Sequence, residues 1–488
     1  MGALHFQQAQ LLETAVVTCA VSMKKGFNPP MTAQAWRAHL DTKRDEHLTE
    51  LVELLGVPSV STDPAHRSDV RRAATIVADR LHTAGVPDVI VAESDGHPAV
   101  IGRWLVDAAQ PTILIYGHYD VQPAEPLELW ETDAFTPTVR DGKLYARGSA
   151  DMKGNLLTAI QGVEAIAATN GGQPPINVTF IFEGEEEIGS PNLRAIVREH
   201  RDRLMANAVV SADGGQHGPG VPSQSVALKG LGGCQVNLTT AKSDLHSGMY
   251  GATVPNAVQS LVQLAATFHD ANGRVTVGGF YDTVKDLTAD ERAEIAAVPF
   301  DEDELKREIG IDELWGEAGW TPRERQWGRP TLDMNGLWGG FQGDGVKTVT
   351  PREAHLKITC RLVPDQDPVE VVELIRAHVA AHRPPGATVE VVSLPGSARP
   401  FVLDRSNFVH IAVGDVLRDL FGREPYVVRT GGTVPATGIF KEELGIDTAT
   451  LGWSMPGSGA HAPNEWYRIE DYYLGRIGYA ALIDRLRR

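Results

Sequence analysis

The sequence predicts an α/β fold in which a mostly parallel-sheet domain, with helices on both faces, is interrupted by an inserted α+β module. Short β-rich runs alternate with helical stretches from about residue 67 to residue 213, a pattern typical of a parallel sheet covered by helices. After about residue 228 the strands become alternating and half-buried, and from about residue 398 the first pattern returns. The chain has 488 residues, too many for one core, so two domains, or one large α/β domain with an insertion, are expected.

The elements of the first part follow from the spacing of their apolar residues. An amphipathic helix is expected over residues 32–55, with an apolar face formed by Trp36, Leu40, Leu48, Leu51 and Leu55. Further helices are expected at 67–84, 152–168 and 191–204. Strands are expected at 89–92, 99–105, 112–118, 176–183 and 207–213.

The later elements define the domain boundaries. Alternating strands are expected at 233–241 and 354–363, helices at 255–269 and 368–382, and a charged excursion at 285–330. A helix at 406–420 and strands at 424–429 and 447–451 complete the chain. We therefore expect a weakly ordered N-terminal extension (1–30), a discontinuous domain (31–228 with 398–488) and an inserted domain (229–397).

Composition excludes several classes of protein. The formal net charge is −18, which disfavours nucleic acid and anionic membrane surfaces as partners. No apolar run reaches the roughly 18 residues that a membrane span needs, and no basic segment that would mark a secretory signal precedes the mildly apolar residues 11–23. Three widely separated cysteines, Cys19, Cys234 and Cys360, favour reduced thiols and hence a cytoplasmic location.

Polar residues gather where the predicted parallel strands end. His118 ends one strand, an acidic run begins at Glu183 at the end of another, and Asp213 ends a third. In open α/β sheets, ligands bind outside the carboxyl ends of the strands. These residues are therefore expected to share one edge of the sheet.

The acidic run contains four carboxylates within five residues: Glu183, Glu185, Glu186 and Glu187. Like charges this close repel one another, and a bound cation would relieve the repulsion. Adjacent glutamates also suit a division of labour between a metal ligand and an acid/base. A solvated turn is the alternative interpretation of this run.

Three further residues are ambiguous when each is taken alone. His118 stands two positions before Asp120, which suits a metal ligand held by a carboxylate but also a buried histidine in a hydrogen-bond network. Asp151 precedes a predicted helix and would also serve as an N-cap. His461 lies in a loop rich in glycine and proline. Taken together, two histidines and three carboxylates suit zinc or manganese better than calcium or copper.

Eight motifs in order carry a resemblance to a known family. They are GHYDVQP, RGSADMKGN, EGEEEIGS, SADGG, DLHSG, CRLVP, GGTVP and GAHAPNE. From about residue 40 onward the chain resembles the co-catalytic dizinc amidohydrolases, which include carnosinases and other dipeptidases, carboxypeptidase G, aminoacylases and succinyl-diaminopimelate desuccinylase. It resembles the carnosinase-like dipeptidases most.

The resemblance implies a dinuclear centre of zinc, with manganese or cobalt as alternatives. The implied ligands are His118 and Asp213 for one ion, Glu187 and His461 for the other, and Asp151 as the bridge. A cis peptide is expected after Asp151. Asp120 would orient His118, and Glu186 would be the general acid/base. The Gly189-Ser190 pair after Glu187 sets this register, because Glu185–Glu186 would otherwise fit the family's glutamate pair.

The inserted domain resembles the family's lid and dimerisation domain. The resemblance implies a homodimer in which His246 acts in the partner's active site. Arg361 and the turn at Gly431, Gly432 and Thr433 match groups that hold the substrate's carboxylate, and Asn256 is a further substrate-binding candidate.

The implied activity is hydrolysis of dipeptides or short peptides that have a free C-terminal carboxylate. A metal-bridged hydroxide would attack the amide, with Glu186 as general base. Deacylation of N-acyl amino acids is the alternative, because both reactions release an amine that bears a carboxylate. A non-catalytic scaffold is disfavoured because Glu186, Asp120 and every ligand are present. A phosphoesterase would be expected to have more basic groups near the site.

Overall fold

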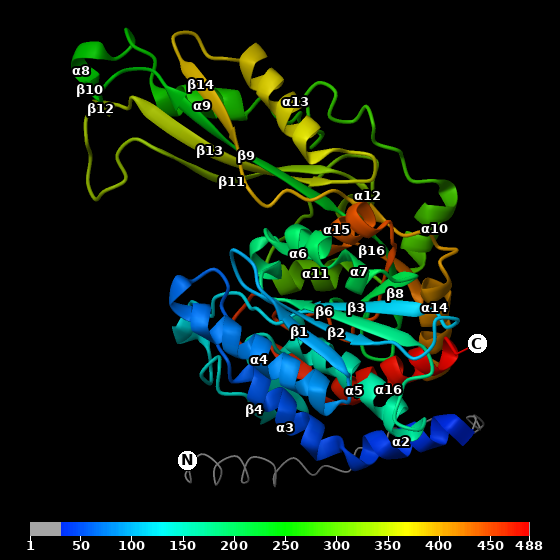
Figure 1. Cartoon of the computed structure of the whole chain (residues 1–488). Coiled ribbons are helices and arrows are strands. Elements are labelled where there is room, and N and C mark those ends of the chain that lie inside the picture. Colours follow the sequence, from blue (N-terminus) through cyan, green and yellow to red (C-terminus); the bar gives the residue numbers. More distant parts are fainter. Residues whose placement is uncertain (1–30, 488) are drawn as a thin grey trace. The chain divides into compact units, whose positions relative to one another are not determined.

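The computed structural model describes residues 31–487 (Figure 1). The extension expected over residues 1–30 lies outside them. Contacts divide the chain into a first unit, which holds the described residues up to Gln224 with Leu403–Tyr426 and Ile439 onward, and a second unit of Ser225–Val402 and Val427–Gly438. The sequence predicts a discontinuous domain (31–228 with 398–488) that carries the metal site and an inserted lid and dimerisation domain (229–397). These functional roles stay a prediction.

The first unit is built on a six-stranded sheet in the order β1-β2-β6-β3-β7-β17. Its strands are β1 (Asp88–Ala92), β2 (Ala99–Trp104), β6 (Asn177–Glu183), β3 (Thr112–His118), β7 (Ala208–Ser211) and β17 (Thr448–Thr450). The pairs β6·β3, β3·β7 and β7·β17 are parallel, and β1 and β2 form an antiparallel edge. β6 is buried along its whole length, as expected of a strand covered on both faces.

Helices cover both faces of this sheet, so the predicted fold class is confirmed. α5 (Gly154–Thr169) connects β3 to β6, whereas α6 (Leu193–Glu199) and α7 (Arg201–Leu204) connect β6 to β7 on the other side of β3. Right-handed crossovers in opposite directions place these helices on opposite faces, as Figure 1 shows. The remaining helices of the unit are α2 (Met31–Thr42), α3 (Arg44–Leu55), α4 (Arg67–Thr83), α14 (Phe408–Phe421) and α16 (Ile469–Arg485).

Two expected helices are interrupted. The helix expected over 32–55 is divided into α2 and α3 at Lys43, next to the Thr42 hydroxyl, which donates to the carbonyl of His39. This bond competes locally with the continuation of the helix. The helix expected over 191–204 is divided at His200, whose φ and ψ are −103° and 22°.

The second unit contains an antiparallel sheet in the order β11-β13-β9-β14. Its strands are β11 (Thr331–Gly339), β13 (Glu353–Leu362), β9 (Gly230–Thr239) and β14 (Thr388–Ser393). Burial alternates along β9 and β13, as the sequence predicts, because α9 (Ala257–Ala265) and α13 (Pro368–Ala381) cover one face only.

Short elements complete the two units. The charged excursion folds into α10 (Ala289–Ala297), α11 (Glu302–Ile309) and α12 (Pro322–Gly328), and α10 and α12 each begin with a capping box. The second unit also has the short helix α8 (Ser247–Tyr250) and a two-stranded sheet of β10 (Leu245–His246) and β12 (Val349–Thr350). A three-stranded sheet is formed by β15 (Phe401–Val402), β8 (Ser223–Leu228) and β16 (Tyr426–Thr430), with β8 in the middle. A small sheet in the first unit consists of β4 (Thr138–Arg140), β5 (Lys143–Tyr145) and β18 (Trp466–Arg468). Helix α15 (Pro435–Leu444) contains residues of both units.

Within residues 31–487, no helix combines the length and the apolar character needed to cross a membrane.

Candidate metal centre

The parallel strands bring the polar strand ends together. His118 is the last residue of β3 and pairs with Glu183, the last residue of β6. Tyr116 of β3 pairs with Ser211 at the end of β7, two residues before Asp213. The carboxyl ends of three adjacent strands therefore meet at one edge, as expected for a site in this kind of sheet.

His118 is fully buried and oriented by its neighbour. Its Nδ1 lies 3.1 Å from the Asp120 carbonyl oxygen and 3.3 Å from the Asp120 carboxylate. If Nδ1 carries the proton, Nε2 is the nitrogen that can bind a cation. Nε2 is buried and has no hydrogen bond among the described residues, although Asp151 Oδ1 is 3.3 Å away. A buried nitrogen that faces a carboxylate without such a bond is a chemically suitable metal donor.

Asp151 belongs to two groups of potential metal donors. One group is His118, Asp151 and Asp213, and the other is Asp151, Glu187 and His461, with the donor atoms of each group within 4.8 Å of one another. Asp151 Oδ2 lies 3.0 Å from His461 Nε2. The residue lies in the irregular segment Ser149–Lys153, and the expected cis peptide between Asp151 and Met152 is present. Asp151 is thus the residue that the two donor groups share.

The second group has its own support. His461 Nε2 lies 3.2 Å from Glu187 Oε2, and Gln122 Nε2 donates to the same oxygen over 2.9 Å. The hydrogen bonds with Asp151 and Glu187 raise the pKa of His461 to about 10. His461 also has a positive φ of 63°, which is uncommon outside glycine and typical of functional loops.

The charge distribution of the site fits divalent cations. Burial, followed by repulsion from Asp151, raises the pKa of Asp213 to about 7. Burial also tends to raise the pKa of Asp151, but its close contacts with the His118 and His461 rings, at 3.3 and 3.0 Å, outweigh this and lower it. Three carboxylates and two histidines converge, and the surroundings of Asp213 disfavour its ionised form. A cation would supply the missing positive charge.

Glu186 lies beside these donors but outside both groups. Burial, followed by repulsion from Asp213, Glu187 and Asp151, raises its pKa well above the ordinary value, although His118 works in the opposite direction. The Asp120 carboxylate accepts from the backbone N–H groups of Glu186 and Glu187, over 3.3 and 3.1 Å. Asp120 therefore supports the glutamate turn as well as His118, and the sequence did not indicate this second contact.

The other two glutamates of the acidic run serve the local structure. Glu183 Oε1 accepts from the Tyr116 hydroxyl and the Ser190 hydroxyl, each over 2.9 Å. Glu185 accepts from the backbone N–H of His97 over 2.8 Å and from the Asn192 side chain over 3.0 Å. Glu187 is thus the glutamate of this run that belongs to a donor group, and Glu186 precedes it directly in the chain.

Some of the expected substrate-binding residues come together in the second unit. Arg361 Nη1 donates to the Thr433 hydroxyl over 3.0 Å, and that hydroxyl donates to the Lys229 carbonyl over 2.5 Å. In the same turn as Gly431, the backbone N–H of Gly432 donates to the Thr430 hydroxyl over 3.2 Å.

His246 and Asn256 are engaged elsewhere in the second unit. His246 is exposed, and its Nδ1 accepts from the backbone N–H of Gly248 over 3.1 Å. The Asn256 side chain caps α9 by accepting from the backbone N–H of Gln259 over 3.2 Å. An N-cap is a sufficient structural role for Asn256.

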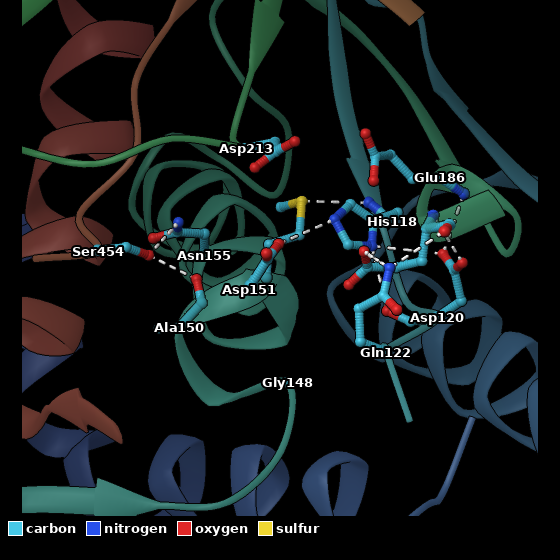
Figure 2. A network of polar contacts seen from close by, with 12 residues as sticks. His118, Asp120, Gln122, Gly148, Ala150, Asp151, Asn155, Glu186, Asp213 and Ser454 are labelled. Carbon is cyan, nitrogen blue, oxygen red and sulfur yellow. Dashed lines mark hydrogen bonds and ion pairs between the residues drawn. The ribbon is translucent and has the colours of Figure 1, made fainter. Parts of the chain in front are cut away.

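Figure 2 shows supporting residues that sequence reasoning did not identify. Asn155 donates to the Gly214 carbonyl over 2.9 Å, next to Asp213, and to the Ser454 hydroxyl over 3.1 Å. Ser454 in turn donates to the Ala150 carbonyl, next to Asp151. Asn155 belongs to the motif RGSADMKGN, so its place in a motif was the available signal, but its partners are about 60 and 300 residues away.

Comparison with known proteins identifies the family. Residues 114–485 match the profile of peptidase family M20/M25/M40. The chain belongs to this family. It is a metal-dependent peptidase, and the donor groups described above agree with that class.

Full-length relatives share this fold. The chain is 31% identical over 453 residues to the Cys-Gly metallodipeptidase dug1 of Schizosaccharomyces pombe, covering 89% of this chain and 94% of that protein. It is 28% identical over 469 residues to the human Beta-Ala-His dipeptidase, with coverage of 93% and 92%. A crystal structure of an M20 family metallo-carboxypeptidase from Sulfolobus solfataricus has a TM-score of 0.81 at 32% identity and covers 91% of this chain and 99% of that one.

Proposed function

We propose that this peptidase hydrolyses dipeptides, or short peptides with a free C-terminal carboxylate. It would use two divalent cations, of which zinc is the first candidate. The observation that carries the proposal is the pair of donor groups that share Asp151. The similarity to a Cys-Gly metallodipeptidase and a Beta-Ala-His dipeptidase, over about nine-tenths of each chain, supports dipeptides as the substrate class.

Five residues would hold the cations: His118, Asp151, Glu187, Asp213 and His461. When bound, the cations would polarise the scissile carbonyl and lower the pKa of the attacking water. Glu186 would accept the proton of that water and then donate it to the leaving amine. Its half-buried carboxyl, on a turn that Asp120 holds, suits both proton transfers.

Arg361 would recognise the carboxylate of the substrate. Thr433 engages its Nη1, and the other guanidinium nitrogens make no hydrogen bond to any residue in the described range. A planar guanidinium with unused donors suits a carboxylate. Gly431 and Gly432 would let the backbone approach the same anion. Asn256 is a weaker candidate, because it already caps α9.

We also propose that the first unit is the catalytic domain and that the second is a lid and dimerisation domain, with His246 acting in the partner's site. His246 lies beside the exposed apolar residues Met249 and Tyr250, which would be covered in a dimer. Cys234 and Cys360 are free thiols, in keeping with a cytoplasmic location. Sedimentation analysis of the purified protein tests the oligomeric state.

A panel of dipeptides beside matching N-acetyl amino acids tests the substrate class. The protein is reconstituted with zinc, and a chelator control is run in parallel. We expect chelator-sensitive cleavage of the dipeptides. Preferential cleavage of the acetylated compounds would assign the protein to the deacylases and would leave the metal-site proposal intact. No cleavage of either class, with both ions bound, would contradict the proposed substrates.

A further inference from the structure

Glu465 is a buried carboxylate that the proposed reaction does not use. It lies four residues after His461 in the motif GAHAPNE, just before β18, and is 0% exposed. Its side chain accepts four hydrogen bonds, at 2.8–3.0 Å: from the Arg147 guanidinium, and from the backbone N–H groups of Gly148, Ala150 and Asp151. Its own carbonyl accepts from the backbone N–H of Ala146 over 3.1 Å.

The segment that Glu465 holds has an irregular backbone. Gly148 has a φ of +81°, and Asp151 has φ −124° and ψ 92°, outside the helical range. Buried backbone N–H groups in such a segment need an acceptor, because no regular helix supplies one. Glu465 supplies it for three of them, including the N–H of Asp151 itself.

We propose that Glu465 is a positioning residue for both metal ions. By fixing the backbone from Gly148 to Asp151, it holds the Asp151 carboxylate between His118 and His461. Because Glu465 lies in the loop that carries His461, one side chain couples the bridging ligand to a terminal ligand from a distant part of the chain. This inference rests on the proposed function, since it requires that Asp151 binds the ions.

The competing explanation is a buried ion pair that stabilises the fold without affecting metal binding. The two explanations differ in which hydrogen bonds matter. Arg147→Met removes the charge partner but leaves the three backbone amides on the carboxylate. Glu465→Gln removes part of the amide contacts, because the Gln side chain presents one acceptor oxygen and an NH₂ group that would face N–H donors.

The decisive comparison is between Arg147→Met and the double variant Arg147→Met/Glu465→Gln. Each single variant leaves one buried charge without its partner, Arg147 in Glu465→Gln and the Glu465 carboxylate in Arg147→Met, whereas the double variant leaves neither. In Arg147→Met the three backbone N–H groups still stabilise that carboxylate. Zn²⁺ is titrated calorimetrically into each metal-free full-length protein at 20 °C, after circular dichroism has shown that it is folded. We expect the Kd of both ions to rise about 10- to 100-fold in the double variant, and to stay within about 3-fold of wild type in Arg147→Met.

A kinetic readout separates positioning from general damage. At saturating Zn²⁺, kcat of the double variant should recover toward that of Arg147→Met, with KM unchanged. Glu164→Gln is the matched control, because Glu164 is a largely buried carboxylate on α5 that pairs with Arg80 over 3.2 Å. Its Zn²⁺ affinity should equal that of wild type.

Equal Zn²⁺ affinity in Arg147→Met and the double variant would overturn the inference. Loss of the fold in both variants that carry Glu465→Gln would overturn it too, because the carboxylate would then hold the fold rather than the ligand. If wild-type protein itself binds fewer than two Zn²⁺ ions, the proposed function fails instead, independently of Glu465.

Discussion

The glutamates that follow β6 differ in what surrounds each carboxylate. Glu183 accepts hydrogen bonds from two hydroxyl groups through one oxygen, and Glu185 accepts them from amide groups. Glu186 and Glu187 face His118 and His461 instead. A single acidic run therefore combines two groups that hold the turn with two groups that are available for chemistry.

Replacing Glu186 by Gln is expected to lower kcat by about 10²- to 10⁴-fold, the usual contribution of a general acid/base. The side-chain volume is kept, and Glu186 is outside both donor groups, so two Zn²⁺ ions should still bind. Steady-state kinetics on a cleavable dipeptide, with metal content measured on the same sample, checks this. Turnover within tenfold of wild type would exclude Glu186 as the base.

Helix α5 links the metal centre to the packing of the first unit. It begins directly after the segment that carries Asp151, and it is buried around almost its whole circumference. A helix that is apolar on all sides belongs in a protein interior. α16 packs along it so closely that a Cβ on Gly162 would lie 2.5 Å from Tyr479 Cβ and 2.8 Å from the Arg476 carbonyl.

Gly162→Ala is therefore expected to destabilise the protein, although alanine favours helix more than glycine does. The propensity gain is about 1 kcal/mol, whereas overpacking against the α16 backbone costs about 1–3 kcal/mol. Gly438→Ala in α15 is the control, because its Cβ would have no neighbour within 4 Å and only the gain should remain. Chemical denaturation of the two variants should shift in opposite directions, and a shift toward stability in both would contradict the packing argument.

The start of α16 should make stability depend on pH. Burial raises the pKa of Asp471 from 3.8 to about 7, with Arg468 opposing and Glu470 assisting the shift. A carboxyl whose folded pKa is raised contributes stability that is present below pH 4 and is lost as the pH rises to 7. We expect Asp471→Asn to gain stability over wild type between pH 5 and pH 8, by about 1–2 kcal/mol. Glu470→Gln, at an exposed neighbour, should show no such trend in denaturation curves.

The two units meet different physical requirements. The first unit collects several carboxylates at one sheet edge in a protein that already has a net charge of −18. The second has a sheet covered by helices on one face only. On the proposed function, cations would balance the charge at this sheet edge, and all five residues of the donor groups belong to the first unit.

Metal removal should accordingly lower the thermal stability of the first unit. An ion at 100 times its Kd stabilises the folded state by about 2.7 kcal/mol, and the effect disappears when a chelator removes the ion. Calorimetric melting of the zinc-loaded protein, of the protein with EDTA, and of the protein after zinc is restored measures this loss and its reversal. A melting profile that is identical under the three conditions would mean that the donor groups bind no ion in the folded protein.

The sequence by itself determined most of the fold and the identity of the candidate ligands. Strands such as β3 and β6 and helices such as α4 have strong periodic patterns, which are local properties of the chain. His118 and Asp213 stand at strand ends, and short motifs mark Asp151, Glu187 and His461. Local signals of this kind can be recognised in the sequence without knowledge of the packing.

Only the tertiary structure decided which polar residues support the site. Glu465 contacts Arg147, 318 positions away in the chain, and Asn155 contacts Ser454, 299 positions away. The motifs RGSADMKGN and GAHAPNE include Asn155 and Glu465, but no local pattern encodes the distant partners that give these residues their roles. The partners of Glu185 were decided in the same way, because the backbone N–H of His97 that it accepts from lies 88 positions away in the chain.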